Sequence, residues 1–302
     1  MSTANTPTVF VLDWDGTIAG RVDFQSQRYS LHQVLRKYGF NGMGAKTHIP
    51  QAFYPGHGLI RPFLVDFIKT MQRITDGNCY FFIYTASERK WATQEIAWVE
   101  RTHGIHFARP IFARDNCIVD GSGNYRKSLK KIWPRILRVV TKHAPLTHRE
   151  KEYMLQRRTV MIDNNAVYVD YTDKLLLCPD YNYMVFENLL ETLPAAAFDH
   201  SVVRQHLLSL ANDGLLCPST YNIHTRMLQS GGDAKTPVMN RLFSEYRWLA
   251  AKCKSVMEAN AAYENDEFWH ILCKLILKNS VRDYPPDVVT QLQTLIWKRY
   301  RS

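Results

Sequence analysis

A stretch near the N-terminus predicts both a fold and the position of a site: Val9-Phe-Val-Leu-Asp-Trp-Asp-Gly-Thr-Ile18. A short run of apolar residues bounded by a glycine is typical of a strand that is buried on both faces, as in a parallel sheet. This strand ends in two carboxylates, Asp13 and Asp15, which are separated by a single residue. In open α/β folds, ligands bind at the carboxyl ends of the strands. The stretch therefore places a pair of acids where such a site is expected.

Buried strands followed by polar residues recur along the first two thirds of the chain. Further strands are expected at 79–87, which ends in small hydroxyl residues, and at 159–162 and 175–178, and helical spacing of apolar residues is found at 61–71 and 88–100. The Asp-Gly-Ser-Gly sequence at 120–123 indicates the tip of a hairpin. Alternating strands and helices predict an α/β fold: a Rossmann-like core with a parallel sheet and a small β-hairpin insert.

The pattern changes near residue 198. Amphipathic helices are predicted at 201–210, 236–257, 266–277 and 286–297, with a linker at 217–235 and no competing strand signal. We therefore expect two domains, an α/β domain over residues 1–198 and an all-α C-terminal domain over residues 199–302.

Composition indicates a folded protein inside the cell. The chain has 302 residues, of which 46% are hydrophobic, a proportion typical of globular proteins. Its six cysteines include no C-x-x-C pair, so we expect buried thiols in a reducing environment, neither disulfides nor a zinc site. The N-terminus lacks the features of a signal peptide, and no apolar run has membrane-spanning length. These features predict an intracellular protein of the cytoplasm or nucleus that is not secreted and has no membrane partner.

Positive charge is concentrated in one segment. The formal net charge is +10, and residues 126–158 contain eleven Lys and Arg but only two acidic residues. Such a concentration favours an anionic partner, either an acidic protein or nucleic acid, although a solvated helical face would have the same composition.

The polar residues at the strand ends form a chemically coherent set. Besides the two aspartates it contains Thr85, Lys127 and the pair Asp163-Asn164. One carboxylate can attack phosphorus while a second protonates the leaving oxygen and later deprotonates water. Two neighbouring acids need a cation, and Mg²⁺ bound by an aspartate, a backbone carbonyl and a later Asp or Asn would supply it. The set therefore suits phosphoryl transfer through an aspartyl-phosphate.

Asp13-Trp-Asp-Gly-Thr17 resembles the first motif of the haloacid dehalogenase-like (HAD) phosphatases. More narrowly, the chain resembles the FCP/SCP-type carboxy-terminal-domain phosphatases, also called NLI-interacting-factor-like phosphatases. The matching blocks occur in the family's order, at 60–67, 82–87, 110–119, 123–129 and 160–165, and the resemblance covers roughly residues 8–198.

The resemblance implies a Mg²⁺-dependent phosphatase whose substrate is a phosphoserine or phosphothreonine in a protein. It implies that Asp13 is the nucleophile and a metal ligand, and that Asp15 is the general acid/base whose backbone carbonyl also binds the metal. Thr85 and Lys127 would be catalytic residues that hold the phosphate. The remaining implied positions are metal ligands at Asn164 and Asp163, and we add a possible phosphate contact from Arg89, near the start of the following helix.

Three departures from the family pattern concern the substrate. Gly16 stands where the family usually has Glu, Ser128 where an acid is usual, and Asn165-Ala166 where Ser-Pro is typical. Two alternatives therefore stay open. One is a polynucleotide-end (3′-) phosphatase that holds a nucleic-acid backbone on the basic segment. The other is a non-catalytic binding scaffold that uses the basic segment and the helical tail.

Overall fold

The computed structural model describes residues 6–40, 49–142, 144–185, 197, 200–203, 205–206 and 258–300. The chain forms two compact units. The first contains residues 1–20, 53–182 and 263–302, and the second contains residues 21–52 and 183–262.

The first unit is built on a parallel sheet. Its strands are β1 (Thr8–Leu12), β2 (Cys79–Tyr84), β3 (Ala108–Phe112), β6 (Thr159–Asp163) and β7 (Leu175–Leu177). They pair in the order β3-β2-β1-β6-β7, and every pairing is parallel. Two short strands, β4 (Ile118–Val119) and β5 (Tyr125–Arg126), form a separate antiparallel hairpin. The predicted α/β fold with a parallel sheet and a small hairpin insert is confirmed.

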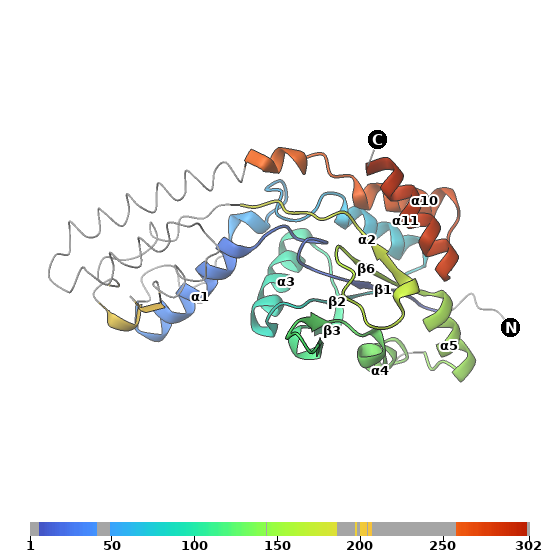
Figure 1. The fold of residues 1–302 in the computed structure, drawn as a ribbon, viewed down its shortest axis with the longest axis horizontal. Coiled ribbons are helices and arrows are strands. Elements are labelled where there is room, and N and C mark those ends of the chain that lie inside the picture. The colour runs from blue at the N-terminus through green and yellow to red at the C-terminus, as the bar shows by residue number, and fades with distance from the viewer. Residues whose placement is uncertain are drawn as a thin grey trace. The chain divides into compact units, whose positions relative to one another are not determined.

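The helices of the first unit lie on both faces of this sheet (Figure 1). They are α2 (Leu64–Ile74), α3 (Arg89–His103), α4 (Leu129–Val140), α5 (His148–Arg157), α10 (Phe268–Lys278) and α11 (Pro286–Tyr300). Short 3-10 helices occur at η2 (Gln51–Phe53), η3 (Arg114–Asn116), η4 (Thr172–Lys174) and η5 (Ala259–Ala262).

Strand β1 is buried on both faces, which explains its unbroken apolar sequence. Val9 and Val11 belong to a core cluster that includes Ile132 and Ile136 of α4. On the other face, Phe10 stacks on Phe81 with ring centroids 5.2 Å apart.

Helices α10 and α11 pack within the first unit. The ring of Trp269 on α10 lies 4.9 Å from that of Phe67 on α2, and the Trp297 indole on α11 donates a hydrogen bond to the Leu177 carbonyl at 3.2 Å. The predicted helices at 266–277 and 286–297 therefore correspond to α10 and α11. The expected domain boundary at residue 198, the linker at 217–235 and the helix at 236–257 lie outside the described residues, so the boundary stays a prediction.

The second unit contains α1 (Asp23–Lys37). The Ser30 hydroxyl of this helix lies 3.1 Å from a ring nitrogen of His206. Asn260 pairs with the backbone of Met184 through two hydrogen bonds. Among the described residues of both units, no helix is long and apolar enough to cross a bilayer.

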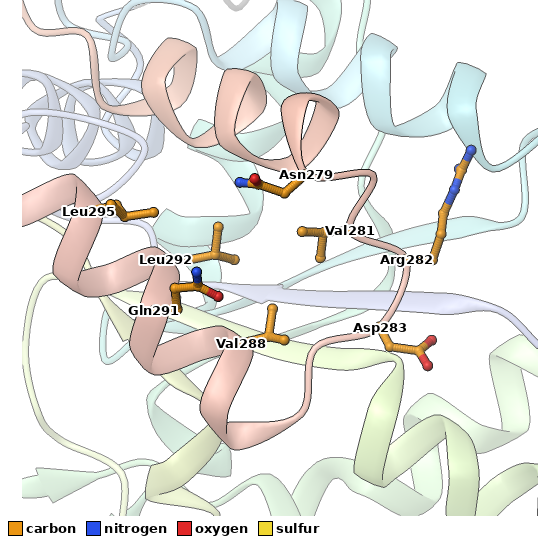
Figure 2. A pocket seen from close by; sticks show the side chains of 8 residues that line it. All are labelled: Asn279, Val281, Arg282, Asp283, Val288, Gln291, Leu292 and Leu295. Carbon is orange, nitrogen blue, oxygen red and sulfur yellow. The ribbon is translucent and has the colours of Figure 1, made fainter.

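A cavity of about 380 Å³ lies between α11 and the segment that follows α10 (Figure 2). Two of its lining residues, Arg282 and Asp283, contact the Ile74 carbonyl and Arg158. Because the Arg158 carbonyl accepts a hydrogen bond from the N–H of Val9, these contacts lie at the amino ends of β1 and β6. The cavity is thus at the edge of the sheet opposite to the strand-end carboxylates.

Candidate active site

The strand order changes direction between β1 and β6. From β1 the sheet continues through β2 and β3 on one side, and through β6 and β7 on the other. In an open α/β sheet, such a reversal leaves a crevice beyond the carboxyl ends of the two central strands. Asp13 comes directly after β1, and Asp163 is the last residue of β6. The strand pairing therefore brings these two carboxylates to one place.

Lys127 lies between the two carboxylates. Its ammonium group donates to Asp163 at 2.7 Å and also to Asp13. The side chain is 3% exposed, and the rings of Tyr84 and Tyr168 lie 5.8 and 5.9 Å from its nitrogen. The Lys127 backbone is fixed by hydrogen bonds to the segment that follows β6, at 3.0 and 2.9 Å. The structure thus joins three of the predicted site residues in one buried network.

The charges in this network stabilise one another. Burial alone lowers the pKa of Lys127, but Asp13 and Asp163 outweigh that effect and raise it. The lysine therefore stays protonated. Burial, together with the charge of Asp13, raises the pKa of Asp163 despite the contact with Lys127. One ammonium group faces two carboxylates in this cluster, so a further cation is needed before an anionic phosphate can be accommodated there.

Asp15 is held by hydroxyl groups that follow β2. Thr85 donates to its carboxylate at 3.1 Å, and Ser87 donates to the same oxygen at 2.7 Å. The backbone N–H of Ser87 in turn donates to the Thr85 hydroxyl at 3.0 Å. Burial and the charge of Asp13 raise the pKa of Asp15. A carboxyl whose protonated form is favoured is suited to give a proton to a leaving group. Ser87 is a site residue that sequence reasoning missed.

Gly16 and Thr17 form a tight turn against the end of β6. The Thr17 hydroxyl lies 3.5 Å from the Asp13 carboxylate and 3.2 Å from the side-chain oxygen of Asn164. The side-chain amide of Asn164 donates to Asp180 at 2.7 Å. Gly16 has a φ of +76°, and a Cβ at this position would lie 2.4 Å from the Asn164 amide nitrogen and 2.6 Å from Asp180. The turn therefore requires glycine for both its backbone conformation and its space.

The oxygen atoms around Thr17 suit a hard cation. Mg²⁺ prefers oxygen ligands and usually takes only one or two carboxylates, keeping several waters. Asp13 and Asn164 each place an oxygen within 3.5 Å of the same hydroxyl. No cluster of three His, Cys, Asp or Glu side chains suited to a metal occurs in the described parts of the chain. A cation here would therefore rely on Asp13, the Asn164 amide oxygen and the Asp15 backbone carbonyl. Asp163 has its two oxygens bonded to Lys127 and to the N–H of Asn165.

Comparison with known proteins agrees with this geometry. A family model described as NLI interacting factor-like phosphatase matches residues 8–201. The chain belongs to this family. It is thus a HAD-type phosphatase, a hydrolase of phosphoric monoesters. No curated protein matches the chain.

Two solved structures are also similar to the chain. One is a variant of the fission yeast RNA polymerase II CTD phosphatase Fcp1 bound to beryllium fluoride, with 14% sequence identity and a TM-score of 0.35. The other is a structure of Fcp1, described as an essential RNA polymerase II CTD phosphatase, with 15% identity and a TM-score of 0.34. Each match covers 93% of this chain and 68% of the other.

The N-terminus of α4, directly after Lys127, is held by two side chains. Ser128 caps α4 by accepting from the N–H of Lys131 at 3.1 Å. Asp170 accepts hydrogen bonds from the Ser128 hydroxyl and, at 2.8 Å, from the N–H of Leu129. A carboxylate from a distant segment therefore lies at the helix N-terminus, where negative charge is favourable.

Arg89 takes part in a different network. Its guanidinium forms an ion pair with Asp115 at 2.7 Å and also donates to Asn116 and to the Ile111 carbonyl. These partners lie at the end of β3 and in η3, and within the described part of the chain Arg89 has no hydrogen bond or ion pair with the carboxylate cluster. The structure thus places Arg89 as a link between α3 and the end of β3, and its predicted contact with phosphate stays a prediction.

Proposed function

We propose that this phosphatase uses Mg²⁺ and a covalent aspartyl-phosphate to hydrolyse phosphoserine or phosphothreonine in proteins. The observation that supports the chemistry is the buried arrangement of Asp13, Lys127 and Asp163, with Asp15 held alongside by two hydroxyl groups. In such a site the Asp13 carboxylate can act as the nucleophile, and Asp15, whose pKa is raised by burial and by the charge of Asp13, can act as the proton donor.

In the first step a carboxylate oxygen of Asp13 attacks phosphorus, and the bond from phosphorus to the substrate oxygen breaks. Asp15 gives its proton to that oxygen, so the serine or threonine hydroxyl leaves in its neutral form. In the second step Asp15 takes a proton from a water molecule, which attacks the phosphorus. The bond to Asp13 then breaks, phosphate is released, and both aspartates return to their starting states.

Lys127 and Thr85 support these steps in the proposal. The Lys127 ammonium already contacts Asp13, so it can neutralise charge on the transferring phosphoryl group without first moving into place. Thr85 donates to Asp15 in the present structure, and its hydroxyl can turn toward a phosphate oxygen when the substrate is bound. When bound to Asp13, Asn164 and the Asp15 carbonyl, Mg²⁺ would offset the repulsion between carboxylate and phosphate.

A protein substrate is supported by the small size of the insert near the site. The hairpin after β3 has two-residue strands, so this insert by itself is too short to enclose a small metabolite. An exposed phosphate on a protein segment therefore suits the site better than a free metabolite.

Turnover of two substrate classes tests the proposal. Purified protein is given a phosphoserine peptide and, separately, a 3′-phosphorylated oligonucleotide, each with Mg²⁺ and with a chelator. We expect Mg²⁺-dependent phosphate release from the peptide. Faster phosphate release from the oligonucleotide would show that the substrate is a nucleic-acid end and not a protein. No release from either substrate, with or without Mg²⁺, would support the scaffold alternative.

A further inference from the structure

The solvent face of α4 carries a continuous row of positive side chains. Successive members are four, three and four residues apart, a spacing that places them on one face of a helix. They are Lys131, Arg135 and Arg138 on α4 and Lys142 in the turn that follows it, all exposed, and we call these four residues the α4 cationic stripe. The opposite face of the helix is buried in the core through Leu129, Ile132, Ile136 and Val140.

Three members of the stripe have no acidic partner. Among the described residues, no carboxylate lies within 4.0 Å of Arg135, Arg138 or Lys142, whereas Lys131 donates to the Cys117 carbonyl at 2.8 Å. Exposed arginines nearby in the sequence do have such partners, for example Arg126 with Asp120 at 2.9 Å. The stripe is therefore an unneutralised positive surface.

The stripe begins beside the candidate active site. Lys127 contacts Asp13, and the next residue, Ser128, is the cap of α4. Helix α4 begins just after Lys127, and Val140 at its other end belongs to the core cluster that also contains Val9 and Met154, near the amino ends of β1 and β6, so α4 runs away from the site toward the amino ends of the strands. Lys131, the first member of the stripe, lies in the first turn of α4, four residues after Lys127. A substrate segment that leaves the site along α4 would meet the four cations in order.

We propose that the α4 cationic stripe binds an acidic flank of the phosphorylated protein segment, a proposal that rests on the function proposed above. From Lys131 to Arg138 the helix rises about 10 Å, and Lys142 lies in the turn beyond the helix end at Val140, so an extended peptide of about five residues is long enough to follow the stripe. In an extended segment, alternate side chains point the same way and are about 6.6 Å apart. This repeat is close to the spacing of about 5–6 Å between successive stripe positions. The preferred flank thus has acidic residues at every second position.

The stripe favours a peptide over a single-stranded nucleic acid. Proteins that hold single strands combine positive charge with aromatic side chains on which the bases stack. The exposed positions of α4 include no aromatic residue. Charge alone, over the length of about five extended residues, suits a short acidic segment.

The test compares matched phosphopeptides on the full chain. Each peptide has one phosphoserine and a five-residue flank in which alternate positions are either Glu or Gln, placed on the N-terminal or the C-terminal side. The stripe variant is R135Q/R138Q/K142Q, which leaves the Lys131 contact with the backbone intact. The control variant, K69Q/R73Q/K278Q, removes the same charge from exposed residues of α2 and α10.

We expect the wild-type protein to prefer the Glu flank on one side, with a lower KM, an unchanged kcat and a preference that weakens as salt is added. The stripe variant should lose this preference, with a rise in KM of about tenfold for the Glu peptide, the sum of three exposed ion contacts. The control variant should behave as wild type. Turnover of the Gln peptide tests the proposed function separately, because its uncharged flank forms no ion pairs with the stripe.

Two results would overturn the proposal. One is equal KM values for Glu and Gln peptides in wild-type protein that turns both over. The other is a preference for the Glu peptide that persists in R135Q/R138Q/K142Q. If this variant keeps that preference but loses binding of an oligonucleotide, the stripe binds nucleic acid and not an acidic peptide.

Discussion

Gly16→Ala is expected to damage the site as well as the fold. The glycine has a φ of +76°, a conformation that costs a residue with a Cβ about 1–2 kcal/mol. The added methyl would also lie 2.4 Å from the Asn164 amide nitrogen and 2.6 Å from Asp180, closer than real contacts allow. The hydrogen bond between these side chains must therefore break or shift, which costs about 0.5–1.5 kcal/mol because the pair is exposed to solvent. We expect a total loss of about 1.5–3.5 kcal/mol in the free energy of unfolding.

Gly77→Ala is the matched control. Gly77 has a φ of +77°, but no atom lies within 4 Å of an added Cβ. This variant should lose only the backbone contribution of about 1–2 kcal/mol and keep wild-type activity. Stability is measured by urea unfolding, and activity as phosphate release at several Mg²⁺ concentrations. Gly16→Ala should need more Mg²⁺ for half-maximal activity, because Asn164 is displaced. Equal stability and equal Mg²⁺ dependence for the two variants would refute the assigned role of this turn.

Three other changes have defined outcomes. Asp266→Asn leaves a buried guanidinium without its carboxylate and should cost about 3–5 kcal/mol in urea unfolding, whereas Asp115→Asn, in an exposed pair, should cost at most about 1 kcal/mol. Burial raises the pKa of Glu95, so above about pH 4.3 the folded state binds more protons than the unfolded state, and stability falls as pH rises. Glu95→Gln should remove a pH dependence of the free energy of unfolding of up to about 1.4 kcal/mol per pH unit. An unchanged pH dependence in urea unfolding would contradict this. Asp180→Ala frees the Asn164 amide and should raise the Mg²⁺ requirement about tenfold in a thermal-shift titration, and no change would exclude that role.

Four of the five strands of the sheet could be predicted because they carry their own signal, whereas β3 (Ala108–Phe112), which includes Arg109 and Pro110, was not predicted. Val9–Leu12 is apolar without interruption because both faces of β1 are buried, and the acids after it mark the carboxyl end of the strand. Asp163 carries the same signal at the end of β6. Lys127 follows a two-residue strand with no buried apolar run, so its place in the set depended on the predicted hairpin and was supported by resemblance to a family.

Other features depend on contacts that no local pattern encodes. Asp180 lies in an irregular segment after β7, yet it accepts from the Asn164 amide. Arg61 and Asp266 form a buried ion pair with two hydrogen bonds of 2.8 Å although 205 positions separate them. The amphipathic pattern of α10 predicted a helix with one apolar face but could not identify α2 as the element that covers it.

The central claim is that phosphate is transferred to Asp13, and trapping the intermediate tests it most directly. Wild-type protein and Asp13→Asn are mixed with a phosphoserine peptide and Mg²⁺, quenched within one turnover, digested and mapped by mass spectrometry. We expect phosphate on the Asp13-containing peptide of the wild-type protein, no such peptide in the variant, and a loss of steady-state phosphate release of at least about a thousandfold. Phosphate on another residue, or wild-type turnover by Asp13→Asn, would contradict the mechanism.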